Sequence, residues 1–477
     1  MRKTYLTALL AVMVLLAHAQ VLKPSVDKRI EMLSLVSRLA GYEEYSSDDA
    51  KKYVTAIHTH FDPYKTDTLI RYAVTVREQL GIGFDAVMSF AVNLEQKGQK
   101  FSLRSNWQKD IDKRWTPEAV REYVRLLNKF YKTAKAETFF GQQKPYYEKV
   151  INAFGQVLAR FNQSWYQEYY GIAPKDQFTI VVGCGNGGGN YGPSVELKNK
   201  THQVYAIMGS WSFDKEGEPV FKEQSYLPTV IHEFNHSFIN PLLTKYENNT
   251  DLQKSMQTLL DTMHTEMAQQ AYRNWHTVLN ESLVRASVVR YLMKNNPADK
   301  SVADEEIIIQ LNRGFLWMRD LVALLGEYEN NRERYATIDV FYPAIIEFFH
   351  AASQKISQTK TTYESNLPQI AAMEPFANGT QQVDPSTKEL VVRFDRVMRG
   401  KGYSINYGPL GSKAFPLKSV LGYTEDNKAI RVELVLKPNT EYEMVLTGLS
   451  FRSSDGYPIR SYVVKFKTGN EGEVNLR

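Results

Sequence analysis

The chain of 477 residues has very little cysteine, since Cys184 is the only one. A disulfide within the chain is therefore excluded, and stability must come from core packing or from a bound ion. We expect the Cys184 thiol to be buried among apolar side chains, with a catalytic nucleophile and an intermolecular bridge as the alternatives.

The chain also lacks a strong charge excess and a long basic run. Lys and Arg together number 58 against 53 Asp and Glu, so the formal net charge is only +5. Nucleic-acid binding relies on clustered positive charge that neutralises phosphates. The composition therefore gives no reason to expect a nucleic-acid partner.

After the N-terminal segment the sequence has no long apolar run. No later segment approaches the ~18 consecutive apolar residues that a membrane span needs. The N-terminus has Arg2 and Lys3, an apolar run over residues 7–17 and a small-residue sequence that ends at Ala19. This order is typical of a secretory signal peptide cut after Ala19, with a buried N-terminal helix as the alternative. We therefore expect a secreted or periplasmic protein with no membrane span.

What is present is enough apolar surface for a large core. Hydrophobic residues make up 43% of the chain and aromatic residues 12%, and the length predicts two or three domains. Residues 26–171 have a helical pattern. Within them, Thr116 is a natural N-cap with Pro117 at the first helical position, and a second helix over residues 69–80 ends at Gly81.

The pattern changes to strands over residues 178–211, and helical character returns over residues 228–355. Between the strands, Gly183, Gly185 and Gly188 formally satisfy a Gly-x-Gly-x-x-Gly pattern. A dinucleotide site needs a helix to begin there, but the following residues cannot begin one and another strand comes next. We therefore expect a flexible loop that borders the functional site.

Apolar residues alternate with exposed ones in several short runs over the last hundred residues, which predicts a small β-sandwich. Three stretches, residues 383–394, 436–449 and 462–469, resemble bacterial immunoglobulin-like domains that are appended to secreted enzymes and surface proteins. The resemblance implies a domain over residues 373–477 that contacts protein, glycan or a cell surface.

A His-Glu-x-x-His motif lies at residues 232–236. The surrounding segment, residues 227–240, is predicted to be a helix with Pro228 near its start and a stop at Asn240-Pro241. Its other residues are largely apolar, so we expect the helix to be buried. Buried imidazoles and carboxylates are expensive unless they bind a ligand or pair, which argues against a surface helix with two incidental histidines.

The spacing of this motif suits a zinc enzyme. The imidazoles of His232 and His236, at positions i and i+4 of a helix, emerge on one face and can reach a single Zn²⁺ at ~2.1 Å. Glu233 then points towards a metal-bound water, whose pKa the metal lowers towards ~7, and can take its proton. The motif therefore predicts hydrolysis, with Glu233 as the catalytic base.

A catalytic zinc site of this kind adds a third protein ligand. The candidate is Glu281, on a second predicted helix, with His264, Glu266 and His276 as weaker rivals. A structural alternative for Glu281 is a helix-start carboxylate paired with Arg285 at i+4. The sequence Asn-Glu that ends at Glu281 resembles the gluzincin branch of the zincin metallopeptidases, which implies that Glu281 is the third ligand.

The gluzincin resemblance has two further implications. Residues 202–211 are expected to form the edge strand that pairs with an extended peptide substrate, with a plain core strand as the alternative. A Tyr or His is expected to stabilise the oxyanion, and Tyr335, Tyr342 and His276 remain open for that role. Over residues 40–360 the chain also resembles an uncharacterised family of secreted bacterial proteins with a central HEFNH-type motif.

Two other features of the sequence bear on this interpretation. His58, His60 and Asp62 match the first metal motif of amidohydrolase barrels, but the surrounding region lacks alternating strands and helices, so we expect a surface or capping role. Asn-x-Ser triplets at Asn235 and Asn280 lie in the two site segments, where glycans would block access. A bacterial secreted protein therefore fits better than a eukaryotic one.

The sequence as a whole predicts an α+β chain in three parts. A signal peptide (residues 1–19) precedes a mostly helical zincin-like region with a small sheet (20–372, helical to about 175) and an all-β immunoglobulin-like sandwich (373–477). The expected function is a secreted zinc peptidase that acts on peptide or protein substrates. The alternative is a catalytically silent zincin-fold protein that binds a partner or a surface.

Overall fold

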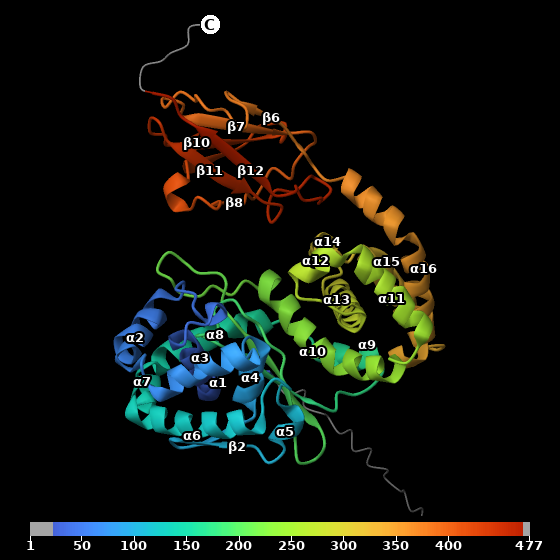
Figure 1. The fold of residues 1–477 in the computed structure, drawn as a ribbon. Coiled ribbons are helices and arrows are strands. Elements are labelled where there is room, and N and C mark those ends of the chain that lie inside the picture. The colour runs from blue at the N-terminus through green and yellow to red at the C-terminus, as the bar shows by residue number, and fades with distance from the viewer. Residues whose placement is uncertain (1–21, 471–477) are drawn as a thin grey trace, which may run out of the picture. The chain divides into compact units, whose positions relative to one another are not determined.

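The computed structural model describes residues 22–470, so the predicted signal peptide lies outside the described residues. The chain is α+β, about half helical with several small sheets (Figure 1), as predicted at this level. It forms two compact units, each made of several separate stretches of the chain. The first unit comprises the described residues up to Tyr246, Leu283–Pro297 and Gly326–Tyr342, and the second comprises Glu247–Ser282, Ala298–Leu325 and the described residues from Pro343 onward.

The N-terminal part of the first unit is helical, as predicted, with one short hairpin that the pattern did not indicate. Its helices are α1 (Lys28–Leu39), α2 (Lys51–Phe61), α3 (Thr68–Leu80), α4 (Asp85–Val92), α5 (Trp107–Asp110), α6 (Pro117–Thr133), α7 (Ala136–Gln142), α8 (Lys144–Gly155) and α9 (Ser164–Tyr170). The hairpin joins β1 (Leu94–Lys97) to β2 (Lys100–Leu103), and short 3-10 helices span Glu43–Tyr45, Asp62–Tyr64 and Gln156–Leu158.

Local sequence signals set the ends of these helices. The Thr116 hydroxyl accepts a hydrogen bond from the backbone N–H of Ala119 at 3.2 Å, and Pro117 occupies the first helical position of α6. Helix α3 ends at Gly81, whose φ of +68° is the left-handed conformation that glycine adopts without strain. Both predicted boundaries are confirmed.

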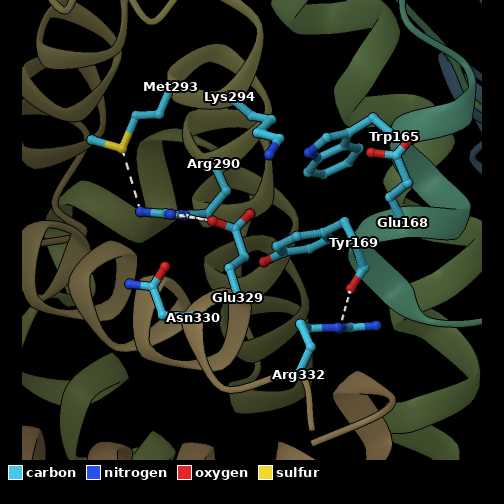
Figure 2. A pocket seen from close by; sticks show the side chains of 9 residues that line it. All are labelled: Trp165, Glu168, Tyr169, Arg290, Met293, Lys294, Glu329, Asn330 and Arg332. Carbon is cyan, nitrogen blue, oxygen red and sulfur yellow. Dashed lines mark hydrogen bonds and ion pairs between the residues drawn. The ribbon is translucent and has the colours of Figure 1, made fainter.

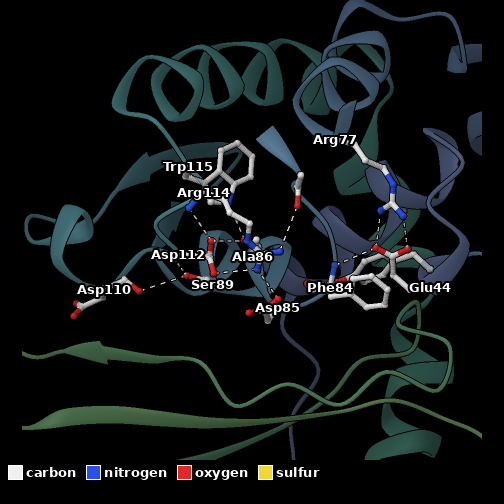
Figure 3. A network of polar contacts seen from close by, with 12 residues as sticks. Glu44, Arg77, Phe84, Asp85, Ala86, Ser89, Asp110, Asp112, Arg114 and Trp115 are labelled. Atoms are coloured by element: carbon white, nitrogen blue, oxygen red, sulfur yellow. Dashed lines mark hydrogen bonds and ion pairs between the residues drawn. The ribbon is translucent and has the colours of Figure 1, made fainter. Parts of the chain in front are cut away.

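Helix α4 packs on α1. Two sets of charged side-chain contacts, drawn in Figure 3, hold the start of α4. The Glu44 carboxylate accepts hydrogen bonds from Arg77 at 2.7 Å and from the backbone N–H of Phe84 at 3.0 Å. Arg114 pairs with Asp85 at 2.6 Å. Because Phe84 has a φ of +50°, which is unfavourable for a residue other than glycine, these contacts hold a turn that would otherwise relax.

The predicted strands are confirmed as β3 (Gln177–Val182) and β5 (His202–Met208), with β4 (Ser194–Glu196) between them in sequence. The sheet order is β3-β5-β4, with β3 parallel and β4 antiparallel to β5. The expected edge strand at residues 202–211 is therefore wrong: β5 is central and β4 is the edge. After β3 the glycine-rich loop reverses the chain direction, so that β4 pairs antiparallel with β5. Hydrophobic periodicity alone does not reveal this pairing.

Helix α10 (Glu223–Tyr246) carries the His-Glu-x-x-His motif and is longer than predicted. The expected stop at Asn240-Pro241 is wrong, because the helix continues through Pro241. Proline has no N–H for the carbonyl of Ser237, which loses one helical hydrogen bond. Burial of Leu242 and Leu243 keeps the last turn packed despite that loss.

The helices of the second unit follow α10 in sequence. They are α11 (Thr250–Thr262), α12 (His264–Gln269), α14 (Ser301–Asn312) and most of α16 (Ile338–Ser365). Helices α13 (Trp275–Asn295) and α15 (Met318–Asn330) contribute residues to both units. Within residues 22–470, no helix has the length and apolar character of a membrane span.

The C-terminal part of the second unit contains two antiparallel sheets. The first has the order β6 (Ile370–Glu374), β7 (Glu389–Phe394), β10 (Ala429–Leu434), β9 (Leu417–Tyr423), and the second has β12 (Tyr462–Lys467), β11 (Glu441–Leu446), β8 (Ile405–Asn406). A short 3-10 helix spans Ser412–Ala414. Alternate residues of β7, including Leu390, Val392 and Phe394, are buried as predicted and share one hydrophobic core with β11 and β12.

Candidate metal centre

The two motif histidines lie on one face of α10. Nε2 of His232 and Nε2 of His236 are 3.2 Å apart. Two imidazole nitrogens that each lie ~2.1 Å from one tetrahedral Zn²⁺ would be about 3.4 Å apart. The rings therefore already have the separation that a shared metal ion needs, as the i, i+4 spacing predicted.

Glu281, on α13, joins them. One ligand atom from each of His232, His236 and Glu281 lies within 4.8 Å of the other two, and Glu281 is 8% exposed. Among residues 22–470 this is the single group of three or more His, Cys, Asp or Glu side chains with such a geometry. The structure thus brings the three predicted ligands together, and their role as ligands stays a prediction.

Asn235, between the two histidines in sequence, ties α10 to its neighbours. It is fully buried; its Nδ2 donates to the carbonyl of Val284 on α13 at 3.2 Å, and its Oδ1 accepts from the Tyr170 hydroxyl on α9 at 2.9 Å. Both partners belong to the first unit. These bonds fix the register of α10 against the middle of α13, one turn after Glu281. The sequence did not predict this role, although a polar residue on the buried face of the motif helix is a signal for it.

Two further polar side chains contact the ligand candidates. Nδ1 of His236 lies 3.3 Å from Oδ1 of Asn240, one turn later on α10. The Tyr272 hydroxyl donates to Oε2 of Glu281 at 3.0 Å. Partners of this kind orient metal ligands and fix the tautomer of a histidine. Nothing in the sequence pattern singled out Tyr272.

The carboxylate of Glu233 lies against the backbone of Gly192, just before β4. A Cβ added to Gly192 would collide with Oε2 of Glu233. Gly192 does not have a positive φ, so the backbone conformation does not require glycine here. The contact with Glu233 is the structural reason for the missing side chain.

The three candidates for the oxyanion role differ in exposure. Tyr342 is fully buried, and burial raises the pKa of its phenol. Its ring stacks on that of Tyr246, with the ring centroids 4.1 Å apart. Its hydroxyl therefore has no access to a substrate. Tyr335 and His276 are half-buried and remain candidates.

The other predicted histidine features lie outside this group. Nδ1 of His58 lies 2.9 Å from Oδ1 of Asp62, and Nε2 of His60 lies 2.8 Å from the carbonyl of Ala134. His264 and Glu266, the rival ligands, belong to no ligand group among the described residues.

The glycine-rich stretch after β3 is a loop followed by a strand, as expected, and no helix begins there. Cys184 lies in it, 7% exposed, and its backbone N–H donates to Oε1 of Glu31 on α1 at 2.7 Å. Burial raises the pKa of the Cys184 thiol well above its ordinary value. The expectation of a buried thiol is confirmed, and the raised pKa disfavours the thiolate that a nucleophile needs.

A separate pocket of about 380 Å³ lies in the first unit and is lined by residues of α9, α13 and α15 together with Arg332 (Figure 2). The guanidinium of Arg290 pairs with Glu329 on its wall, and Arg332 donates to the carbonyl of Tyr169 at 2.9 Å. None of its lining residues is a predicted ligand or base, so it is distinct from the metal centre.

Two solved structures show a weak likeness to this chain. A crystal structure of the S-layer protein rSbsC matches with 14% identity and a TM-score of 0.17, covering 84% of this chain and 46% of the other. The N-terminal part of the bacterial S-layer protein SbsC matches with 13% identity and a TM-score of 0.17, covering 89% and 79%. The chain thus spans about half the length of the first structure, and TM-scores this low do not indicate a shared fold.

Comparison with curated proteins gave no match. A family model does match, over residues 22–348, and it names neither a zincin nor an immunoglobulin-like family. The matched residues include the motif helix α10 and Glu281, so the candidate metal centre lies within the matched segment. The chain belongs to the family described as Domain of unknown function (DUF4932).

Proposed function

We propose that the protein is a zinc-dependent peptidase in which His232, His236 and Glu281 hold the metal and Glu233 is the catalytic base. The observation that carries the proposal is the convergence of the three ligand atoms within 4.8 Å, with the base one residue after the first histidine. Two imidazoles and one carboxylate are the donor set of many catalytic zinc sites.

The surroundings of these residues support zinc. The 3.2 Å separation of the two Nε2 atoms is close to the distance that tetrahedral coordination sets, and Asn240 and Tyr272 lie beside two of the three ligands. Zn²⁺ held in such a set supplies Lewis acidity and lowers the pKa of a coordinated water towards about 7. The donor chemistry does not favour Ca²⁺ or Mg²⁺, which prefer oxygen ligands.

The roles of the chain's own residues follow from their positions. Glu233 takes a proton from the attacking water and passes it to the leaving amine, as a carboxylate in this place can do. Gly192, in contact with Glu233, lies two residues before strand β4. A peptide or protein as the substrate is supported by the donor set and the base, which suit metal-assisted hydrolysis of a peptide bond.

The test is metal analysis and hydrolysis of a broad peptide library by the purified full chain. We expect about one equivalent of zinc, its loss in His232→Ala, and in Glu233→Gln retained zinc with hydrolysis lowered by at least ~10²-fold. Glu223→Gln, at the start of the same helix and paired with Arg160, is the matched control and should leave both unchanged. Zinc below about a third of an equivalent, unaffected by His232→Ala, would contradict the proposal.

We also propose a bacterial secreted or periplasmic location after cleavage at Ala19. Full burial of Asn235 supports a protein that is not glycosylated at this triplet. The two sheets with one shared core over residues 370–467 support an immunoglobulin-like sandwich over residues 373–477 that contacts protein, glycan or a cell surface. Residues 20–372 then form the catalytic region.

A further inference from the structure

The loop between β3 and β4 is attached to a buried carboxylate at its start. Glu31 on α1 is 1% exposed, and its Oε1 accepts from the backbone N–H of Cys184 at 2.7 Å. Its Oε2 accepts from the Tyr53 hydroxyl at 2.7 Å. One turn along α1, the Ser34 hydroxyl donates to Oδ1 of the fully buried Asn186 at 2.6 Å. Helix α1 therefore holds the first residues of the loop by side-chain contacts on one face.

The same loop is bonded to the chain that leaves β5. The N–H of Gly183 donates to the carbonyl of Met208 at 2.8 Å, and the N–H of Ser210 donates to the carbonyl of Gly187 at 2.6 Å. A Cβ on Gly209 would collide with the carbonyl oxygens of two loop residues. Two backbones approach here at a distance that only glycine permits. The loop is thus a packed part of the structure.

The end of the loop is fixed by the β-ladder. Tyr191 exchanges two backbone hydrogen bonds with Ile207, at 3.0 and 2.9 Å, and the N–H of Tyr205 donates to the carbonyl of Pro193 at 2.9 Å. Gly192 lies between these two bonded positions and cannot shift without breaking one of them. The carboxylate of Glu233 contacts the chain at Gly192, which these hydrogen bonds hold in place.

We infer that residues 183–192, here named the glycine brace, position the Glu233 carboxylate, with Glu31 as the anchor and Gly192 as the contact. The inference rests on the proposed function, since it concerns the base of that reaction. Glu31 and Gly192 are positioning residues: they act through Glu233 and touch no ligand of the metal centre in the contacts described. A carboxylate on a long, rotatable side chain needs such a support, because a displacement of ~1 Å can lower a rate about 10²-fold.

The direct test is Gly192→Ala in the full chain. The added Cβ occupies the place of Oε2 of Glu233, so we expect kcat to fall by roughly 10²-fold with KM and zinc content unchanged. Gly141→Ala, on α7 and outside the glycine brace, is the matched control: no atom lies within 4 Å of its added Cβ. It should retain the activity of the unmodified chain.

A second substitution provides a readout that a general loss of structure would not give. Glu233→Asp withdraws the carboxylate by one methylene, so it lowers kcat in the native background but leaves room for the alanine methyl. We therefore expect the Gly192→Ala/Glu233→Asp double variant to be at least about 10-fold more active than the product of the two single effects predicts. Glu31→Leu, which removes both acceptor oxygens at the anchor, should lower kcat by about 10-fold with zinc unchanged.

The outcomes separate this inference from the function on which it rests. Full activity of Gly192→Ala, or strictly additive effects in the double variant, would overturn the glycine brace while Glu233→Gln still abolishes hydrolysis. Full activity of Glu233→Gln, or a native chain that hydrolyses nothing, would overturn the proposed function and the inference with it. Loss of zinc in Gly192→Ala would also overturn the inference, because the effect would then lie in the ligands.

Discussion

The amide of Asn235 joins helix α10 to helix α13 through a 3.2 Å hydrogen bond from its Nδ2 to the carbonyl of Val284. That carbonyl belongs to a helix interior, where most carbonyls accept only a backbone N–H. The bond fixes one helix against the other at a point between His232 and His236 in sequence and one turn from Glu281. A single buried side chain therefore sets the relation of the two helices that carry the predicted ligands.

Replacing Asn235 with Ala should destabilise the protein by about 1–3 kcal/mol, because the core loses two hydrogen bonds worth about 0.5–1.5 kcal/mol each. The bonds that are lost are those to the Tyr170 hydroxyl and to the Val284 carbonyl. Urea unfolding followed by circular dichroism measures the change. Tyr170→Phe, which removes only one of the two bonds, should cost about half as much. Equal stability of Asn235→Ala and the native chain would show that these bonds contribute nothing.

Removal of the Asn240 side chain should weaken zinc binding without abolishing it. Oδ1 of Asn240 lies 3.3 Å from Nδ1 of His236, where it can accept the ring N–H and leave Nε2 free for the metal. Loss of such a partner typically lowers metal affinity about 10–100-fold. Competition with a zinc chelator measures the affinity of Asn240→Ala. Asn330→Ala, at an exposed asparagine that lines the separate 380 Å³ pocket, is the control. An affinity equal to that of the native chain would exclude this role of Asn240.

The features that the sequence predicted are those set by local spacing. The histidines at i, i+4 share a face of any helix, and a Thr-Pro start or a Gly stop needs only neighbouring residues, as at Thr116 and Gly81. The proximity of Glu281 to the two histidines was also predicted, from a family resemblance, and its role as a ligand stays a prediction. These parts depend little on how distant segments pack.

The features that the sequence did not predict depend on packing between distant segments. The pairing of β4 on the free side of β5 is set by the loop after β3, and alternation cannot distinguish an edge strand from a central one. Helix α10 continues past Pro241 because the buried Leu242 and Leu243 offset one lost hydrogen bond. The contacts of Gly192 with Glu233 and of Tyr272 with Glu281 likewise join residues that sequence spacing does not relate.

Glu31 should make stability depend on pH. Burial raises the pKa of this carboxyl from 4.5 to about 7, against hydrogen bonds from Tyr53 and from the backbone of Cys184 that favour the charged form. The folded chain therefore binds a proton that the unfolded chain releases between about pH 4.5 and pH 7. The free energy of unfolding should fall as pH rises through that range, by at most ~3 kcal/mol from this group.

Urea unfolding of Glu31→Gln at pH 5 and pH 8 tests this dependence. Glutamine does not titrate, so we expect the loss of stability between the two pH values to be up to ~3 kcal/mol smaller than in the native chain. Glu118→Gln, an exposed position on α6, should keep the native pH dependence. Identical pH profiles for Glu31→Gln and the native chain would show that Glu31 has an ordinary pKa despite its burial.

Cys184 should be unreactive in the folded chain. Its side chain is buried and burial raises the pKa of the thiol, so both access and the thiolate that reacts with electrophiles are lacking. We expect labelling by iodoacetamide at pH 8 to be at least about 10²-fold slower in the native chain than in urea, and the chain to remain free of disulfide-linked dimers on non-reducing gels. A Cys184→Ser variant is the background control. Rapid native labelling or a covalent dimer would instead identify an accessible thiol and restore the intermolecular bridge as its role.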